Sequence, residues 1–178
     1  EEMVGARAGG TRPGTGSQER RILGDDGKAT AFMARGAAQE ALDSRGIEPG
    51  AVDLIVVATV TPDMLFPATA CLVQDNLGAS NAWGFDLSAA CSGFIYALTT
   101  GAQFIETGQA ETVLVIGADK MSSIVDYTDR TTCILFGDAA GAVVLEADAE
   151  AGLHDAVHPV GGDHRQLLPT RRGGTPHP

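Results

Sequence analysis

The amino-acid sequence predicts an α/β fold in which helices cover a mainly parallel, mixed sheet. Two near-continuous aliphatic runs, 52–59 and 112–118, are typical of strands buried on both faces. Helices are expected before and between these runs, at 29–46, 67–78 and 91–107. Strands that alternate with helices indicate parallel pairing, because each helix can carry the chain back to the starting edge of the sheet.

The first helix and the first strand have clear local signals. Residues 29–46 are Ala-rich, with Phe32 and Leu42 near one face, and Gly46 is a plausible C-terminal stop. A Glu-Pro-Gly turn separates this helix from the aliphatic run at 52–59. The continuous apolar character of that run favours a strand with both faces covered.

The later elements continue the alternation. Residues 67–78 are expected to form a helix with Pro67 in its first turn and Gly78 at its end. A short buried strand at 82–87 leads into the next helix, and a last strand is expected at 140–146.

Length and composition fit one globular domain. The chain has 178 residues, of which 44% are hydrophobic and 20% charged, enough to bury a core. No apolar run approaches the about 18 residues needed to cross a bilayer, and no signal peptide is visible, so a cytoplasmic protein without a membrane partner is expected. A net charge of −11 argues against a nucleic-acid partner. The three cysteines fit neither a disulfide framework nor a metal site.

The two ends of the chain differ from its centre. Residues 1–20 are rich in Gly, Thr and Arg without a hydrophobic period, and an irregular arm is expected there. Residues 149–178 hold all four histidines and four of the eight prolines, and an irregular tail is expected. Out-of-frame translation is one hypothesis for the tail and for 5–17. The interval 21–148 is then the folded unit.

Cys91 carries the strongest chemical signal. It stands among small residues where the strand at 82–87 turns into the helix at 91–107. Unpaired N–H groups and the positive end of the macrodipole favour a thiolate at a helix start. Small neighbours let a substrate carbonyl approach the sulfur. Most intracellular cysteines only fill space in a core, but this setting favours a nucleophile.

Four segments carry a resemblance to a known family. The chain resembles the first half of a β-ketoacyl-[acyl-carrier-protein] synthase III, a condensing enzyme of the thiolase fold, over roughly 18–147. QERRIL at 18–23 resembles the end of the family's arginine-containing loop. The four segments are DLIVVATVTPDMLFPATACLVQDNLG (53–78), GFDLSAACSGFIYAL (84–98), VLVIGADKMSS (113–123) and DYTDRTTCILFGDAAGAVVLE (126–146).

The resemblance implies a role in the initiation of fatty-acid biosynthesis. Cys91 would take an acyl group from acyl-CoA, and the thioester would accept a carbanion formed by decarboxylation of malonyl-acyl carrier protein. The Cys91 backbone N–H would belong to an oxyanion hole. No cofactor beyond these substrates is implied. The partners implied are acyl-CoA, acyl carrier protein and a second copy of the chain.

Four further residues are expected to bind substrate by the same resemblance. Phe66 matches a phenylalanine that lines the acyl pocket of the neighbouring subunit, and from the sequence alone it could equally be core. Arg130 matches an arginine that contacts the CoA adenine, although a loop arginine more often satisfies carbonyls or a nearby carboxylate. Met121 and Phe136 fall near the expected acyl pocket and fit the core equally well.

The family's condensation step also needs a histidine and an asparagine from its second half. None of the four histidines in 149–178 matches a family motif, and Asn76 and Asn81 lie in a helix-to-strand connection. The chain is therefore expected to lack condensing activity alone, and a non-catalytic half that pairs with another chain is an alternative. A cysteine α/β-hydrolase is a further alternative, since 89–93 resembles a nucleophile elbow and Asp155 or Asp163 precedes a histidine.

Overall fold

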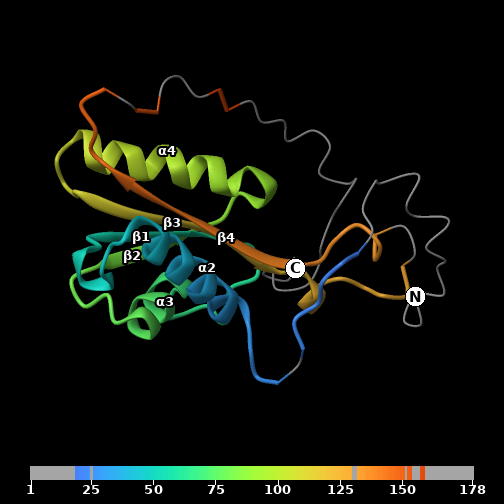
Figure 1. Cartoon of the computed structure of the whole chain (residues 1–178). Coiled ribbons are helices and arrows are strands. Elements are labelled where there is room, and N and C mark those ends of the chain that lie inside the picture. The colour runs from blue at the N-terminus through green and yellow to red at the C-terminus, as the bar shows by residue number, and fades with distance from the viewer. Residues whose placement is uncertain (1–18, 25, 130–131, 151, 154–156, 159–178) are drawn as a thin grey trace.

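The computed structural model describes residues 19–24, 26–129, 132–150, 152–153 and 157–158. Its centre is a four-stranded sheet in the order β2-β1-β3-β4, with helices on both faces (Figure 1). The strands are β1 (Leu54–Ala58), β2 (Trp83–Leu87), β3 (Thr112–Lys120) and β4 (Asp138–Glu146). The helices are α2 (Thr30–Arg45), α3 (Thr69–Leu77) and α4 (Gly93–Glu106), with short 3₁₀ turns η1 (Pro49–Ala51), η2 (Ala90–Ser92) and η3 (Met121–Ser123).

The pairing confirms the predicted mainly parallel, mixed sheet. Strand β1 lies parallel to both β2 and β3, whereas β4 runs antiparallel to β3. The three parallel strands therefore end at one edge of the sheet, and the antiparallel β4 begins there. The carboxyl edge of a parallel sheet is where α/β proteins commonly place their sites.

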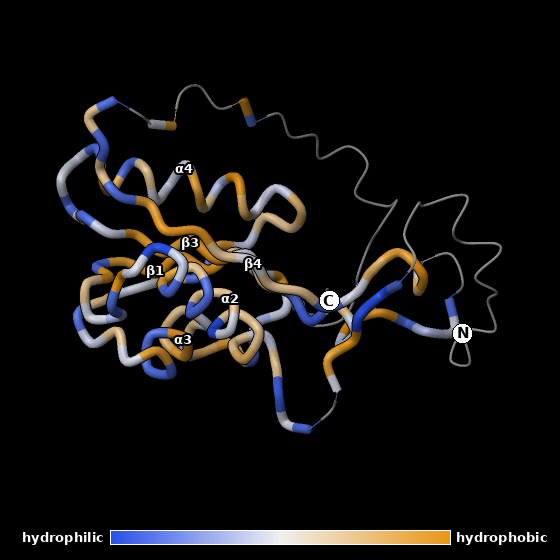
Figure 2. The backbone as a smooth tube through the Cα atoms, viewed as in Figure 1, coloured by the Kyte–Doolittle hydropathy of each residue, from blue (hydrophilic) through white to orange (hydrophobic). Residues whose placement is uncertain are grey.

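The two faces of the sheet are covered unequally. Helices α2 and α3 lie on one face, and α4 lies alone on the other (Figure 1). Because side chains alternate along a strand, Ile55 and Val57 face α2 and α3 while Leu54 and Val56 face α4. Figure 2 shows the hydrophobic residues concentrated on the strands between these layers.

Two details of the helix and strand predictions were wrong. Phe32 lies on the exposed side of α2, with Lys28 Nζ 4.9 Å from its ring centroid, while the buried face uses Ala34, Ala38 and Leu42. Strand β2 is an edge strand and is only partly buried, because β1 is its one neighbour in the described sheet. Burial depends on position in the sheet, which the local pattern of β2 does not encode.

The helix ends follow local chemistry, but the start of α3 depends on another strand. Gly46 and Gly78 adopt the left-handed conformation that ends α2 and α3, as predicted. Helix α3 begins at Thr69, after Pro67 rather than with it. Its first N–H groups are accepted by the Asp86 carboxylate of β2, at 2.7 Å from Thr69 N and 2.8 Å from Ala70 N.

Among the described residues, no helix is both long and apolar enough to span a bilayer. The expected arm at 1–20 and tail at 149–178 lie almost wholly outside these residues. The division into arm, half-domain and tail therefore stays a prediction.

Candidate functional site

Cys91 lies in the turn that joins β2 to α4. The turn is η2, and Ser92 N donates to Ala89 O at 3.1 Å within it. Ala90, directly before the cysteine, has φ 47°, a left-handed conformation that is uncommon for a residue with a side chain. The Cys91 side chain is exposed at this bend. Such backbone conformations are often found at functional sites, where surrounding packing maintains them.

Two glycines let the start of α4 approach the sheet closely. A Cβ on Gly93 would lie 3.2 Å from the Ala58 Cβ, and one on Gly117 would lie 3.2 Å from Phe94 Cδ2. These contacts are tighter than ordinary van der Waals packing, so larger residues would lift the helix from the strands. The close approach holds the Cys91 turn against the carboxyl ends of β1 and β3.

An open pocket of about 470 Å³ adjoins the cysteine. Its walls come from the end of β1, the Cys91 turn, the end of β3 and the start of β4. Most lining residues are small, which leaves room beside the sulfur for an apolar group. The lining residues are Ala58, Ala90, Cys91, Phe94, Gly117, Ala118, Asp119, Met121, Gly137, Ala139, Ala140 and Gly141.

The four residues expected to bind substrate differ in where they lie relative to this pocket. Met121, in η3, lines the pocket with Cys91. Phe136 is half-buried and is not among the described lining residues, although its neighbour Gly137 is. Phe66 is 84% exposed on the loop between β1 and α3, so the alternative that it belongs to this chain's core was wrong. Arg130 lies outside the described residues.

The sequence analysis missed Asp119 in the wall of this pocket. Its Oδ1 accepts hydrogen bonds from Thr59 Oγ1 at 3.0 Å, Val60 N at 2.8 Å and Thr61 Oγ1 at 3.1 Å. One carboxylate oxygen thus fixes the chain as it leaves β1. A carboxylate near the end of a predicted parallel strand was the available signal, because strand ends gather at one edge.

The remaining polar candidates do not gather at Cys91. His158 contacts α4 instead, with its ring centroid 5.0 Å from that of Tyr96 and its Nε2 3.3 Å from Thr99 Oγ1. Asn81 donates to Gly50 O at 2.7 Å. Asp155, Asp163 and the other histidines lie outside the described residues. A search of the described residues finds no cluster of His, Cys, Asp or Glu able to hold a metal ion.

Comparisons with known proteins converge on one family. The family model for 3-oxoacyl-[acyl-carrier-protein (ACP)] synthase III matches residues 85–159, which include Cys91 and its turn. The β-ketoacyl-[acyl-carrier-protein] synthase III of Chlorobaculum tepidum is 59% identical over 167 residues. That match covers 92% of this chain and 51% of the relative. The predicted resemblance to the β-ketoacyl-[acyl-carrier-protein] synthase III family is confirmed.

Other synthase III proteins support the same family and fold. The relative from Chlorobium phaeovibrioides is 51% identical over an alignment that spans all of this chain and 55% of the relative. The crystal structure of the Aquifex aeolicus synthase III aligns with a TM-score of 0.79 at 48% identity, covering 84% of this chain and 48% of that one. The described chain therefore has the α/β fold of one thiolase-like half, as predicted.

The chain spans about half the length of the curated synthase III relatives it matches. The family model runs to residue 159, and the Chlorobium phaeovibrioides alignment includes both 1–20 and 149–178. The alignment thus extends through the segments for which an irregular arm and tail are expected, and the division into arm, half-domain and tail stays a prediction.

One titrating group beside the site gives a pH prediction. Partial burial raises the pKa of the Tyr127 phenol above its ordinary value of 10.0, and electrostatic interactions with Asp138 and Cys133 raise it further. In the unfolded chain the phenol ionises first, so folded-state stability falls as pH rises above about 10. We expect Tyr127→Phe to reduce this decline in the free energy of unfolding, measured by urea unfolding between pH 8 and 11. Parallel stability curves for the variant and the parent protein would contradict the expectation.

Proposed function

We propose that this chain carries the acyl-accepting half of a β-ketoacyl-[acyl-carrier-protein] synthase III. The observation that carries the proposal is the exposed Cys91 thiol, at a strained strand-to-helix turn beside a pocket of small residues. In this step the Cys91 thiolate attacks the acyl-CoA carbonyl carbon. The tetrahedral intermediate expels the CoA thiolate, which takes up a proton, and a Cys91 thioester remains.

The Cys91 turn also offers backbone donors to the developing oxyanion. The first N–H groups of a helix have no intrahelical acceptor, and α4 begins two residues after Cys91. The Cys91 N–H would stabilise charge on the thioester oxygen. Met121 and Phe136 would lie along the acyl chain, and Arg130 would contact the CoA adenine.

Condensation with malonyl-acyl carrier protein belongs to the complete protein in this proposal. The resemblance assigns the required histidine and asparagine to the family's second half, so the described residues would perform only the first half-reaction. No cofactor is required, and a cytoplasmic location follows from the same resemblance. Incubation with acetyl-CoA, followed by intact mass measurement, tests the step. A folded chain that never gains one acetyl group would contradict the proposal.

The same proposal includes a second copy of the chain as partner. Leu65 and Phe66 are 90% and 84% exposed at the tip of the loop between β1 and α3, beside the half-exposed Met64. Three consecutive apolar side chains in water are unfavourable, and such patches commonly mark contacts with another protein. By the family resemblance, Phe66 would enter the acyl pocket of the partner copy.

A charge placed at the tip of this loop tests whether the loop contacts a second copy of the chain. We expect Phe66→Asp to raise the Kd of self-association at least about tenfold, since a carboxylate is costly to bury in an apolar contact. Analytical ultracentrifugation measures the change. Phe32→Asp is the matched control, because Phe32 is also an exposed phenylalanine but lies on α2. Equal effects of the two variants would contradict a specific role for Phe66.

A non-catalytic half that pairs with another chain is the second candidate function. The exposed apolar side chains on β2 and α4 favour it, because Trp83 of β2 and Ile95 of α4 are each nearly half exposed. A folded monomer in light scattering, together with an acyl adduct on Cys91, would contradict this candidate.

A further inference from the structure

Asp138, the first residue of β4, is a buried carboxylate that joins three segments of the chain. It is 8% exposed. Its Oδ1 accepts from Ser122 N at 2.7 Å, and its Oδ2 accepts from Ser122 Oγ at 2.6 Å and from Leu23 N at 2.8 Å. Its own N–H donates to Arg21 O at 2.8 Å. One side chain thus ties 21–23 to η3 and to the start of β4.

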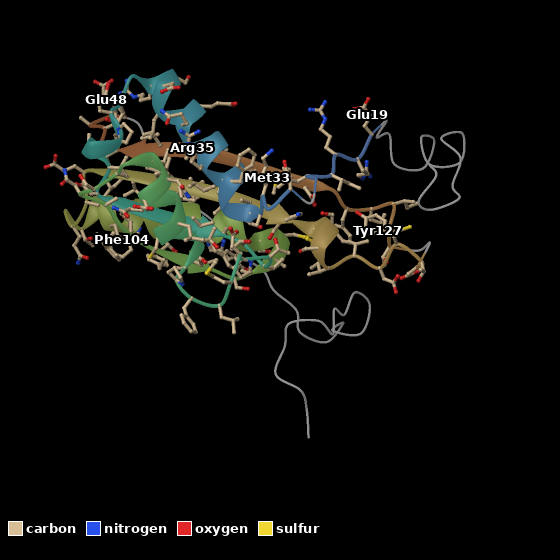
Figure 3. All side chains as sticks on the ribbon, turned by 90° about the horizontal axis from the view of Figure 1, so that it is seen from below. Glu19, Met33, Arg35, Glu48, Phe104 and Tyr127 are labelled. Atoms are coloured by element: carbon tan, nitrogen blue, oxygen red, sulfur yellow. The ribbon has the colours of Figure 1, made fainter. Side chains whose placement is uncertain are left out.

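Further contacts hold the same segment in place. Arg20 Nε donates to Leu135 O at 3.1 Å. The backbone of Arg21 passes so close to Gly137 that a Cβ there would lie 3.0 Å from Arg21 O. Figure 3 shows Glu19 and Tyr127 at the same end of the molecule, where this segment meets the loop before β4. Residues 19–23 are therefore anchored by carbonyl, amide and carboxylate groups together.

The anchored residues adjoin the Cys91 pocket. Met121, directly before Ser122, lines it, and so do Gly137 and Ala139 on either side of Asp138. The Asp138 carboxylate therefore fixes two separate stretches of one pocket wall relative to each other. Charge-assisted hydrogen bonds of this kind are short and strong, and loss of the acceptor would leave buried donors unsatisfied.

We propose that Asp138 is a positioning residue that sets the wall of the Cys91 pocket formed by Met121 and 137–141. It touches no reacting atom in this role. It fixes the space into which the acyl group enters, and this assignment rests on the proposed acyl transfer to Cys91. The effect of Asp138 on the conformation of the pocket wall can be measured without acyl-CoA.

The first test compares Asp138→Asn with Ser122→Ala. Asparagine keeps the size of the side chain but replaces one acceptor oxygen with an NH2 group that would face the N–H and O–H donors. Ser122→Ala removes only the hydrogen bond from Ser122 Oγ. It is the milder variant to use if Asp138→Asn folds poorly. We expect the acetyl-CoA concentration for half-maximal acylation of Cys91 to rise about tenfold in Asp138→Asn and less in Ser122→Ala. The rate at saturation should change less than about threefold. A loss in the saturating acylation rate of both variants, with no change in the half-saturating acetyl-CoA concentration, would overturn the proposal.

The second test does not depend on acyl transfer. We expect Asp138→Asn to raise trypsin cleavage after Arg20 and Arg21 relative to Arg45, and to change the Cys91 alkylation rate by iodoacetamide at least threefold, read by peptide mass. Asp43→Asn, an exposed aspartate that accepts one bond from Gln39, is the control. If the parent protein forms no adduct, the proposed function fails, and these two readouts still decide the role of Asp138. Unchanged cleavage and alkylation in a folded Asp138→Asn would overturn it.

Discussion

Replacing Cys91 with alanine is expected to abolish the acyl adduct formed with acetyl-CoA. Removal of a nucleophile costs several orders of magnitude in rate, so the variant should acylate at least about 10³-fold more slowly. Alanine is small enough for the crowded turn between β2 and α4, and the fold should persist. Intact mass and peptide mapping measure the adduct and its position, while circular dichroism checks the fold.

The matched control is Cys71→Ala. Cys71 is also an exposed cysteine, but it lies on α3 and is not among the residues that line the Cys91 pocket. Its replacement should leave the extent of acylation unchanged. An adduct that persists in Cys91→Ala, or that maps to Cys71, would show adventitious thiol acylation and contradict the role of Cys91.

Gly84→Ala is expected to destabilise the fold by about 3 kcal/mol. Gly84 of β2 pairs with Ile55 of β1, and a Cβ there would lie 2.6 Å from Ile55 O and 3.0 Å from the Ala70 Cβ. The contact with Ile55 O is shorter than a side chain tolerates and is with backbone, which cannot rotate away, and the contact with the Ala70 Cβ is tighter than ordinary packing. Overpacking of this kind costs roughly 1–3 kcal/mol or more. Urea unfolding followed by circular dichroism measures the loss.

Gly141→Ala provides the comparison within the same sheet. Gly141 is a strand residue of β4, and no atom lies within 4 Å of a Cβ built on it. We expect its unfolding free energy to stay within about 0.5 kcal/mol of the parent protein. Similar losses in both variants would contradict the close approach of β1 as the cause of the effect at Gly84.

The order and type of the central elements could be predicted from local pattern. The run at 52–59 became β1, with every residue from Leu54 to Ala58 buried. Gly46 and Gly78 ended their helices as expected, because the left-handed conformation at a helix end is a local requirement. Burial was harder to predict. Trp83 and Phe32 are apolar yet largely exposed, since each lies at an edge or on an outer helix face.

The candidate site was likewise predictable only in part. Cys91 and its turn were predictable, because a strand, small residues and a helix follow one another along the chain. Its pocket was not, since it is assembled from four separate segments. The place of Asp119 near a strand end was a usable signal, but the hydrogen-bond partners of Asp119 and Asp138 lie 15 or more residues away and no local pattern identifies them. The place of Phe136 beside the acyl chain stays a prediction, and among the described residues its neighbours Gly137, Ala139 and Ala140 line the pocket.

The sequence alone determined the α/β alternation, the helix ends, the family resemblance and the nucleophile candidate, because each depends on residues close together in the chain. Only the tertiary structure decided the edge position of β2, the need for glycine at position 84 and the use of buried carboxylates as anchors. These depend on which strands become neighbours. That choice brings backbone groups from distant segments within hydrogen-bonding or steric distance, and no local pattern records it.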